Sequence, residues 1–187
     1  IKILPLSFGD LNNCSFNILK NFLKSELYIV FGCSFIKGKL ANFLIKRKAI
    51  NIHIGVAPYY RGTDCNFWAL YDGNSDLVGA TVHYLSEKLD GGKIIFHALS
   101  EYNKDPFLYS MSTVKSAFYG IRKHLKNNKK KSKTLNQNKK KLIRYSRRKD
   151  FNNNSIKNFF KFKIKDKKKI LKNFKNPYIL KSSEYFK

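Results

Sequence analysis

Hydrophobic and polar positions in the first two thirds of the chain change period repeatedly, which predicts alternating strands and helices. An unbroken apolar run at 27–33 predicts a strand buried on both faces. Apolar positions at helical spacing over 35–47 predict an amphipathic helix, and 49–54 reads as a second short strand. A strand, helix and strand in this order form a right-handed crossover, so the pattern favours an α/β fold with a mostly parallel sheet.

The same patterning continues to about residue 125. The elements expected here are a short helix over 12–24, a helix capped by Thr63 or Asp64 that stops near Gly73, strands at 79–85 and 93–100, and a long helix over 105–125. Aromatic and aliphatic side chains dominate these segments, which is typical of a domain with a real core.

Charge divides the chain into two parts. Lysine and arginine number 38 against 12 acidic residues, a formal charge of +26. Residues 1–114 hold 12 basic and 9 acidic side chains, whereas residues 115–187 hold 26 and 3. Such a basic segment attracts nucleic acid, anionic membranes or phosphorylated ligands. Lysine outnumbers arginine 32 to 6, however, which argues against dense bidentate recognition, and an A/T-rich coding sequence also explains the excess.

We therefore expect three regions: a folded domain over 1–125, a solvated Lys/Asn-rich linker over 126–141, and a basic C-terminal extension over 142–187. Within the extension, 142–145 favours a small strand and 155–175 a basic helix.

The cysteine and hydropathy patterns indicate in which cellular compartment the protein is expected. The three cysteines form no CxxC pair, so neither a zinc site nor a disulfide framework is expected. The longest apolar run is too short to span a bilayer. These features favour a cytoplasmic protein without a metal or a membrane span.

Two polar side chains end the second strand. Asn51 and His53 are two positions apart, so their side chains point to the same side of the strand. An amide donor beside a group that titrates near neutrality suits the stabilisation of a developing oxyanion. His83 and His97 lie inside later strands and are expected to be satisfied core residues.

Asp90 lies in a tight loop between two strands. Two glycines follow it, which suits a close approach of the backbone to a ligand, although an ordinary hairpin turn has the same composition. Arg61-Gly62 fits either an anion site or a surface turn. Taken alone, each of these groups also fits a structural role.

Order and spacing are more specific than any single group. The segments are Asn51-x-His53, Arg61-Gly62 after Pro58, an aromatic helix ending at Gly73, Gly79-Ala80-Thr81-Val82-His83, and Leu89-Asp90-Gly91-Gly92-Lys93-Ile94-Ile95. Together they resemble the formyltransferase family over residues 27–125. The resemblance implies a Rossmann-like fold and an enzyme of one-carbon metabolism that transfers a formyl group from 10-formyltetrahydrofolate to an amine.

The resemblance also implies residue roles. Asn51, His53 and Asp90 match the catalytic Asn, His and Asp of the family. Binding of the formyl donor falls on the backbone of two loops, which contain Ser34, Phe35, Ile36, Lys37 and Gly38 in the first and Glu87, Leu89, Gly91 and Gly92 in the second. Tyr60, Arg61 and Gly62 are expected to contact the acceptor.

The sequence leaves the identity of the acceptor undecided among three hypotheses. The aromatic segments around Arg61 favour a small, phosphorylated amine such as an amino-sugar nucleotide. Charged tRNA is the alternative, with the basic extension along its phosphates. A third hypothesis is a non-catalytic, basic RNA-binding protein on the same fold. The resemblance implies that the family's first strand–helix–strand unit is short or missing here, and Ile54-Gly55 departs from its usual Pro and hydroxyl residue.

Overall fold

The computed structural model describes residues 2–126, 134–160 and 179–180. The strands are β1 (Ile29–Phe31), β2 (Ile50–His53), β3 (Tyr60–Gly62), β4 (Gly79–Tyr84), β5 (Ile94–Leu99), β6 (Arg144–Ser146) and β7 (Ile179–Leu180). The α-helices are α1 (Phe16–Lys20), α2 (Gly38–Lys46), α3 (Cys65–Tyr71), α4 (Pro106–Lys126) and α5 (Asn153–Phe159), and short 3-10 turns are η1 (Asp10–Asn12), η2 (Ser75–Leu77), η3 (Lys139–Lys141) and η4 (Arg148–Asp150).

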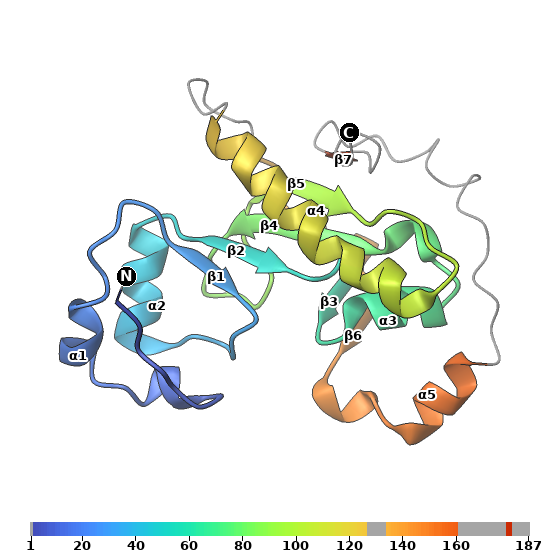
Figure 1. The fold of residues 1–187 in the computed structure, drawn as a ribbon, viewed down its shortest axis with the longest axis horizontal. Coiled ribbons are helices and arrows are strands. Elements are labelled where there is room, and N and C mark those ends of the chain that lie inside the picture. Colours follow the sequence, from blue (N-terminus) through green and yellow to red (C-terminus); the bar gives the residue numbers. More distant parts are fainter. Residues whose placement is uncertain (1, 127–133, 161–178, 181–187) are drawn as a thin grey trace.

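Five strands form the main sheet in the order β1-β2-β4-β5-β7 (Figure 1). The strands β1 and β2 are parallel and joined through α2, as the sequence predicts, and β7 is parallel to β5. The strand β4 runs antiparallel to both of its neighbours. The α/β class is confirmed, with the parallel crossover in its first part and a hairpin inserted beside it.

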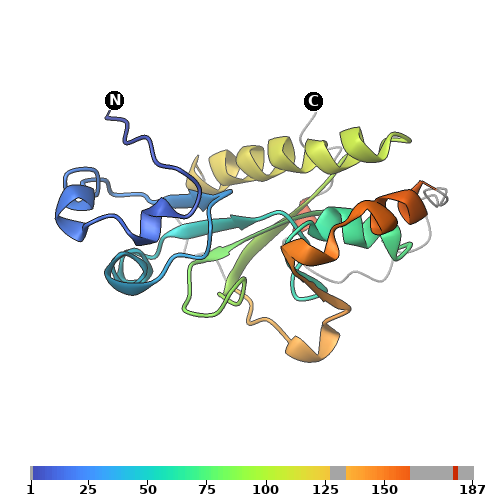
Figure 2. The same cartoon turned by 90° about the horizontal axis from the view of Figure 1, so that it is seen from below.

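The helix α4 covers one face of the sheet, and α2 lies on the opposite side (Figure 2). The covered face is apolar: Ile52 on β2, Val82 on β4 and Ala98 on β5 pack with Ile121 of α4. Burying this face against a helix contributes hydrophobic stabilisation to the sheet. The opposite face carries the polar side chains described below.

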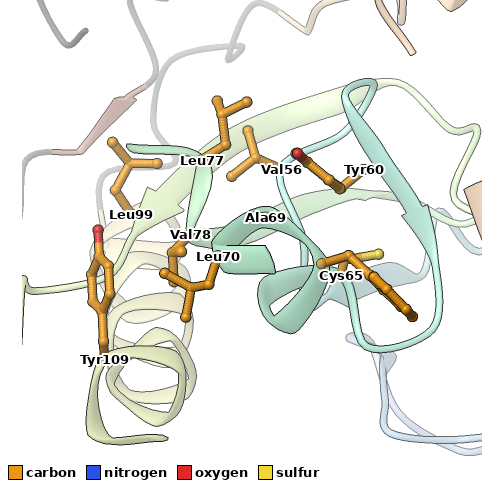
Figure 3. Close-up of a cluster of buried hydrophobic side chains, with 10 residues drawn as sticks. Val56, Tyr60, Cys65, Ala69, Leu70, Leu77, Val78, Leu99 and Tyr109 are labelled. Atoms are coloured by element: carbon orange, nitrogen blue, oxygen red, sulfur yellow. The ribbon is translucent and has the colours of Figure 1, made fainter. Parts of the chain in front are cut away.

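A second core lies beyond the end of the sheet (Figure 3). It joins α3 to the start of α4 through Leu70, Leu77, Val78 and Tyr109, all of them buried. A third cluster packs α1 and α2 against β1. In the part of the chain that the structure describes, no helix is long and apolar enough to cross a membrane.

The strand β1 differs from the expectation of burial on both faces. Only Val30 is buried, whereas Ile29 and Phe31 are 41% and 40% exposed. The reason is position: β1 lies at an edge of the sheet, and α4 packs mainly on β4 and β5, with Phe118 in edge-to-face contact with Phe31.

Several helices are shorter than predicted. In the segment 12–24 the α-helix is limited to the five-residue α1, which follows the turn η1. The helix α5 ends at Phe159, and the predicted helix beyond residue 160 lies outside the described residues. Asp64 precedes α3 in a left-handed conformation and makes no side-chain cap. Asn152, by contrast, caps α5 by accepting hydrogen bonds from two backbone amides.

A small second sheet ties the C-terminal extension to the domain. The strand β6 confirms the small strand expected at 142–145. It pairs in parallel with β3, in a segment that the sequence indicated as a turn. Arg144 donates to both carboxylate oxygens of Asp72, with Nε–Oδ2 at 2.9 Å and Nη2–Oδ1 at 2.5 Å, and stacks on Trp68. Phe151 and Phe159 both contact Phe67 of α3, so the extension is packed on the domain as far as α5.

Candidate active site

The polar face of the sheet is built by strand alternation and register. Asn51 and His53 flank Ile52, so they point away from α4. On β4, His83 lies opposite Asn51 and Thr81 lies opposite His53. Side chains of directly opposed residues share a face, so one small area collects amide, hydroxyl and imidazole groups.

His53 and Asp90 are in contact. The Nδ1 atom of His53 lies 3.4 Å from Oδ1 of Asp90, and the two side chains are only 6% and 8% exposed. The Nε2 atom of His53 lies 3.1 Å from the Tyr60 carbonyl oxygen. Both ring nitrogens therefore face acceptor oxygens, an arrangement that satisfies the doubly protonated, charged imidazolium. The structure brings these two predicted residues together.

Asn51 is held by His83. The Asn51 Nδ2 group donates to His83 Nε2 at 3.0 Å, and His83 Nδ1 donates to the Tyr84 carbonyl at 2.8 Å. Burial lowers the pKa of His83 to about 4, so the ring is neutral and keeps one nitrogen as an acceptor. Sequence reasoning placed His83 in the core and missed this role; the register of two adjacent strands was the signal that could have found it.

The loop after β2 is fixed by side chains from β4 and β5. Thr81 Oγ1 donates to the Gly55 carbonyl and accepts from the Ala57 amide. His97 Nε2 lies 2.7 Å from the Ala57 carbonyl, and burial lowers its pKa to about 4. His53 is thus followed by a loop whose backbone has little freedom to move.

Gly55 explains one departure from the family pattern. A Cβ at this position would lie 2.5 Å from Cys65 Cβ and 2.6 Å from His53 Nε2, closer than van der Waals contact allows. Burial, reinforced by the charge of Asp90, raises the pKa of the Cys65 thiol. The thiol therefore stays protonated, and Cys65 acts as a packing residue and not as a nucleophile.

Asp90 lies in the loop that joins β4 to β5. Asp90 has a left-handed backbone, with φ of 47°, and its Oδ2 accepts from the Gly62 amide at 3.3 Å. A Cβ at Gly92 would lie 1.7 Å from the Tyr84 carbonyl oxygen, so only glycine fits there. The Gly-Gly pair therefore has a steric cause.

The first predicted donor-binding loop follows β1. Asn12, in η1, donates to the Phe35 carbonyl at 2.7 Å and accepts from the Lys37 amide at 2.8 Å, so it fixes this loop from outside. Each predicted donor loop exposes one large apolar side chain, Phe35 at 43% and Leu89 at 38%. These surfaces suit the packing of a planar heterocycle. No sequence pattern marked Asn12, because its contact spans distant segments.

The three residues predicted to contact the acceptor, Tyr60, Arg61 and Gly62, lie in different environments. The Tyr60 side chain is 1% exposed and its hydroxyl bonds to Asp72 and Asn74, so it lies in the core and cannot contact an acceptor as expected. The Arg61 guanidinium donates to the Leu89 carbonyl at 3.0 Å. Gly62 contributes its amide to Asp90.

Known proteins resemble this chain in sequence and in fold. Residues 19–105 match the sequence model of a family described as formyl transferase. Over this part of its length the chain is similar to the formyltransferase family. Methionyl-tRNA formyltransferase of Listeria welshimeri is 44% identical over 50 residues, which are 27% of this chain and 16% of that relative. The match therefore spans only a small part of the relative's length.

Solved formyltransferases share the fold. PseJ from Anoxybacillus kamchatkensis, solved with UDP-4,6-dideoxy-4-formamido-L-AltNAc and tetrahydrofolate, is 27% identical with a TM-score of 0.53, covering 68% of this chain and 67% of that one. A 4-N formyltransferase from Francisella tularensis is 25% identical with a TM-score of 0.53, covering 74% and 57%. The formyltransferase fold is thus shared over more than half of each chain.

Proposed function

We propose that the chain transfers a formyl group from 10-formyltetrahydrofolate to the amine of a nucleotide-linked amino sugar. The observation that carries the proposal is the buried pair of His53 and Asp90 beside Asn51 on one face of the sheet. The likeness to a formyltransferase solved with a UDP-linked sugar and tetrahydrofolate supports the choice of acceptor and donor.

The donor supplies a formyl carbon that an amine can attack. Asn51 and charged His53 donate hydrogen bonds to the formyl oxygen as negative charge develops on it. For this, the formyl oxygen replaces the Tyr60 carbonyl as the partner of His53 Nε2. Asp90 holds the charge of His53, takes the proton from the attacking amine and returns it to the folate nitrogen as the old C–N bond breaks.

Donor binding falls to the loops Ser34–Gly38 and Glu87–Gly92. Their exposed apolar side chains, Phe35 and Leu89, offer packing surface to the pterin ring. Arg61 places a positive charge beside the second loop, where it attracts the phosphates of the acceptor.

The test is a transfer assay with 10-formyltetrahydrofolate and a panel of amino-sugar nucleotides, followed by mass spectrometry of the acceptor. We expect one acceptor to gain a formyl group, and His53→Ala to abolish the gain. Absence of transfer to every amine in the panel contradicts the proposal.

Methionyl-tRNA is included as a competing acceptor, because the Listeria relative is a methionyl-tRNA formyltransferase and the chain is strongly basic. A tRNA acceptor predicts a KM that rises steeply with salt concentration, since lysines would replace counterions on the phosphates. A sugar nucleotide predicts a shallow dependence.

A further inference from the structure

The loop that carries Asp90 is held by side chains that come from outside the hairpin. Besides Arg61 on the Leu89 carbonyl, Gln137 Nε2 donates to the Asp90 carbonyl at 2.6 Å and to the Gly92 carbonyl at 2.9 Å. Three carbonyls of this short loop are thus fixed by two long side chains. Gln137 supplies two of the three bonds.

Gln137 is brought there by an added strand pairing. Residue Leu135 forms an antiparallel bridge with Ile94, the first residue of β5, through Ile94 N–Leu135 O at 2.8 Å and Leu135 N–Ile94 O at 3.0 Å. The segment 134–138 thereby lies along the end of the hairpin, below the sheet in Figure 2. A stretch that the sequence indicated as part of a solvated linker is docked on the candidate active site.

The orientation of the Gln137 amide follows from its partners. Both partners are carbonyl oxygens, which only accept, so the NH2 group has to face them. The opposite orientation would set Oε1 against two oxygen atoms. The two N–H groups of the Gln137 amide therefore donate one hydrogen bond each, to the carbonyl oxygens of Asp90 and Gly92.

We infer that Gln137 is a positioning residue for Asp90 in the proposed formyl transfer. By fixing the carbonyls on both sides of Gly91, it stabilises the left-handed backbone of Asp90, and this backbone directs the carboxylate to His53 and to the Gly62 amide. The inference rests on the proposed function, and it makes the segment after α4 part of the working site. The same loop lines the predicted donor site, so its position also affects binding of 10-formyltetrahydrofolate.

The experiment compares wild type with Gln137→Met, which keeps the length of the side chain and removes both donors. Asn136→Met is the matched control, because Asn136 is the exposed neighbour. We expect Gln137→Met to lower kcat about 10- to 100-fold and to raise the KM for the formyl donor several-fold, with the KM for the amine unchanged. A merely structural role would lower the melting temperature and leave both KM values unchanged, which overturns the inference.

Amide hydrogen exchange of Gly62 gives a readout that needs no activity. Because this amide donates to Asp90 Oδ2, we expect its exchange to speed up about tenfold or more in Gln137→Met and to stay unchanged in Asn136→Met. Unchanged exchange overturns the inference even when formyl transfer is established. If wild type transfers no formyl group, the proposed function fails and the exchange result alone decides whether Gln137 fixes the loop.

Gln137→Glu keeps the test decisive if Gln137→Met does not fold. At neutral pH it has the same length and no donor, so we expect the same loss of kcat and the same faster exchange. If neither variant folds, Gln137 is a stability residue and the inference is wrong.

Discussion

Asn51 and His83 lie directly opposite each other on β2 and β4, and the Asn51 amide donates to the neutral ring of His83 at 3.0 Å. This bond fixes the Asn51 amide, the group that we propose to donate to the formyl oxygen. His83→Leu removes the acceptor, and we expect kcat to fall about 10- to 100-fold. His83→Gln offers a side-chain oxygen in its place and should retain most of the activity. Equal activity in the two variants would contradict this role.

His53 and Asp90 carry the proposed chemistry directly. His53→Ala and Asp90→Asn should each lower kcat by about 10²- to 10⁴-fold, because an oxyanion donor or a proton acceptor is lost. Circular dichroism and thermal unfolding check that both variants fold. The control is Glu101→Gln, an exposed carboxylate outside the site, which should behave as wild type. A rate close to wild type in Asp90→Asn would remove Asp90 from the mechanism.

Buried histidines make stability depend on pH. Burial lowers the pKa of both His83 and His97 to about 4, below the ordinary value of 6.5. Below pH 6.5 the unfolded chain binds protons that the native state does not, so stability falls as the pH drops from 6.5 toward 4. We expect a loss of about 2 kcal/mol per histidine between pH 7 and pH 5.

Urea unfolding over this pH range measures the effect, with His97→Gln as the comparison. Glutamine keeps a donor for the Ala57 carbonyl and does not titrate. The variant should show a shallower fall of stability with acid, whatever its stability at pH 7. An unchanged slope would mean that His97 does not contribute.

The ion pair of Arg144 and Asp72 joins β6 to α3. Two charge-assisted hydrogen bonds and stacking on Trp68 support it, although Arg144 is 35% exposed and partly screened by solvent. The bond to Asp72 raises the pKa of Arg144, so the guanidinium stays charged. Arg144→Met should reduce the free energy of unfolding by about 1–2 kcal/mol. A double-mutant cycle with Asp72→Asn measures the coupling, and additive losses would show that the pair contributes nothing.

A side chain at position 92 would overlap neighbouring atoms, whereas a side chain at position 73 would not. In Gly92→Ala the new Cβ would overlap the Tyr84 carbonyl, so the loop must move, and we expect loss of activity together with a destabilisation of about 3 kcal/mol. Gly73 has a left-handed φ of 77° and open space around it. We therefore expect Gly73→Ala to reduce the free energy of unfolding only through backbone strain, by about 1 kcal/mol. Similar losses in the two variants would contradict the steric explanation.

The sequence by itself predicted most of the strands and helices and the candidate site residues Asn51, His53 and Asp90. Periodicity of apolar residues predicted β1, α2, β2, β4, β5 and α4, because each element buries one face whose spacing is set by its own geometry. The two-residue spacing of Asn51 and His53 was enough to place both side chains on one face. The motif spacing, compared with a known family, identified Asp90.

Tertiary structure alone decided which distant groups meet. The contact of Asp90 with His53, the bond from His83 to Asn51, and the reach of Gln137 into the Asp90 loop join segments far apart along the chain. The exposure of β1 and the burial of Tyr60 likewise depend on which neighbours cover them. Local patterns encode the period of an element and the face it buries, whereas long-range contacts follow from sheet order and loop path, which no short stretch of sequence specifies.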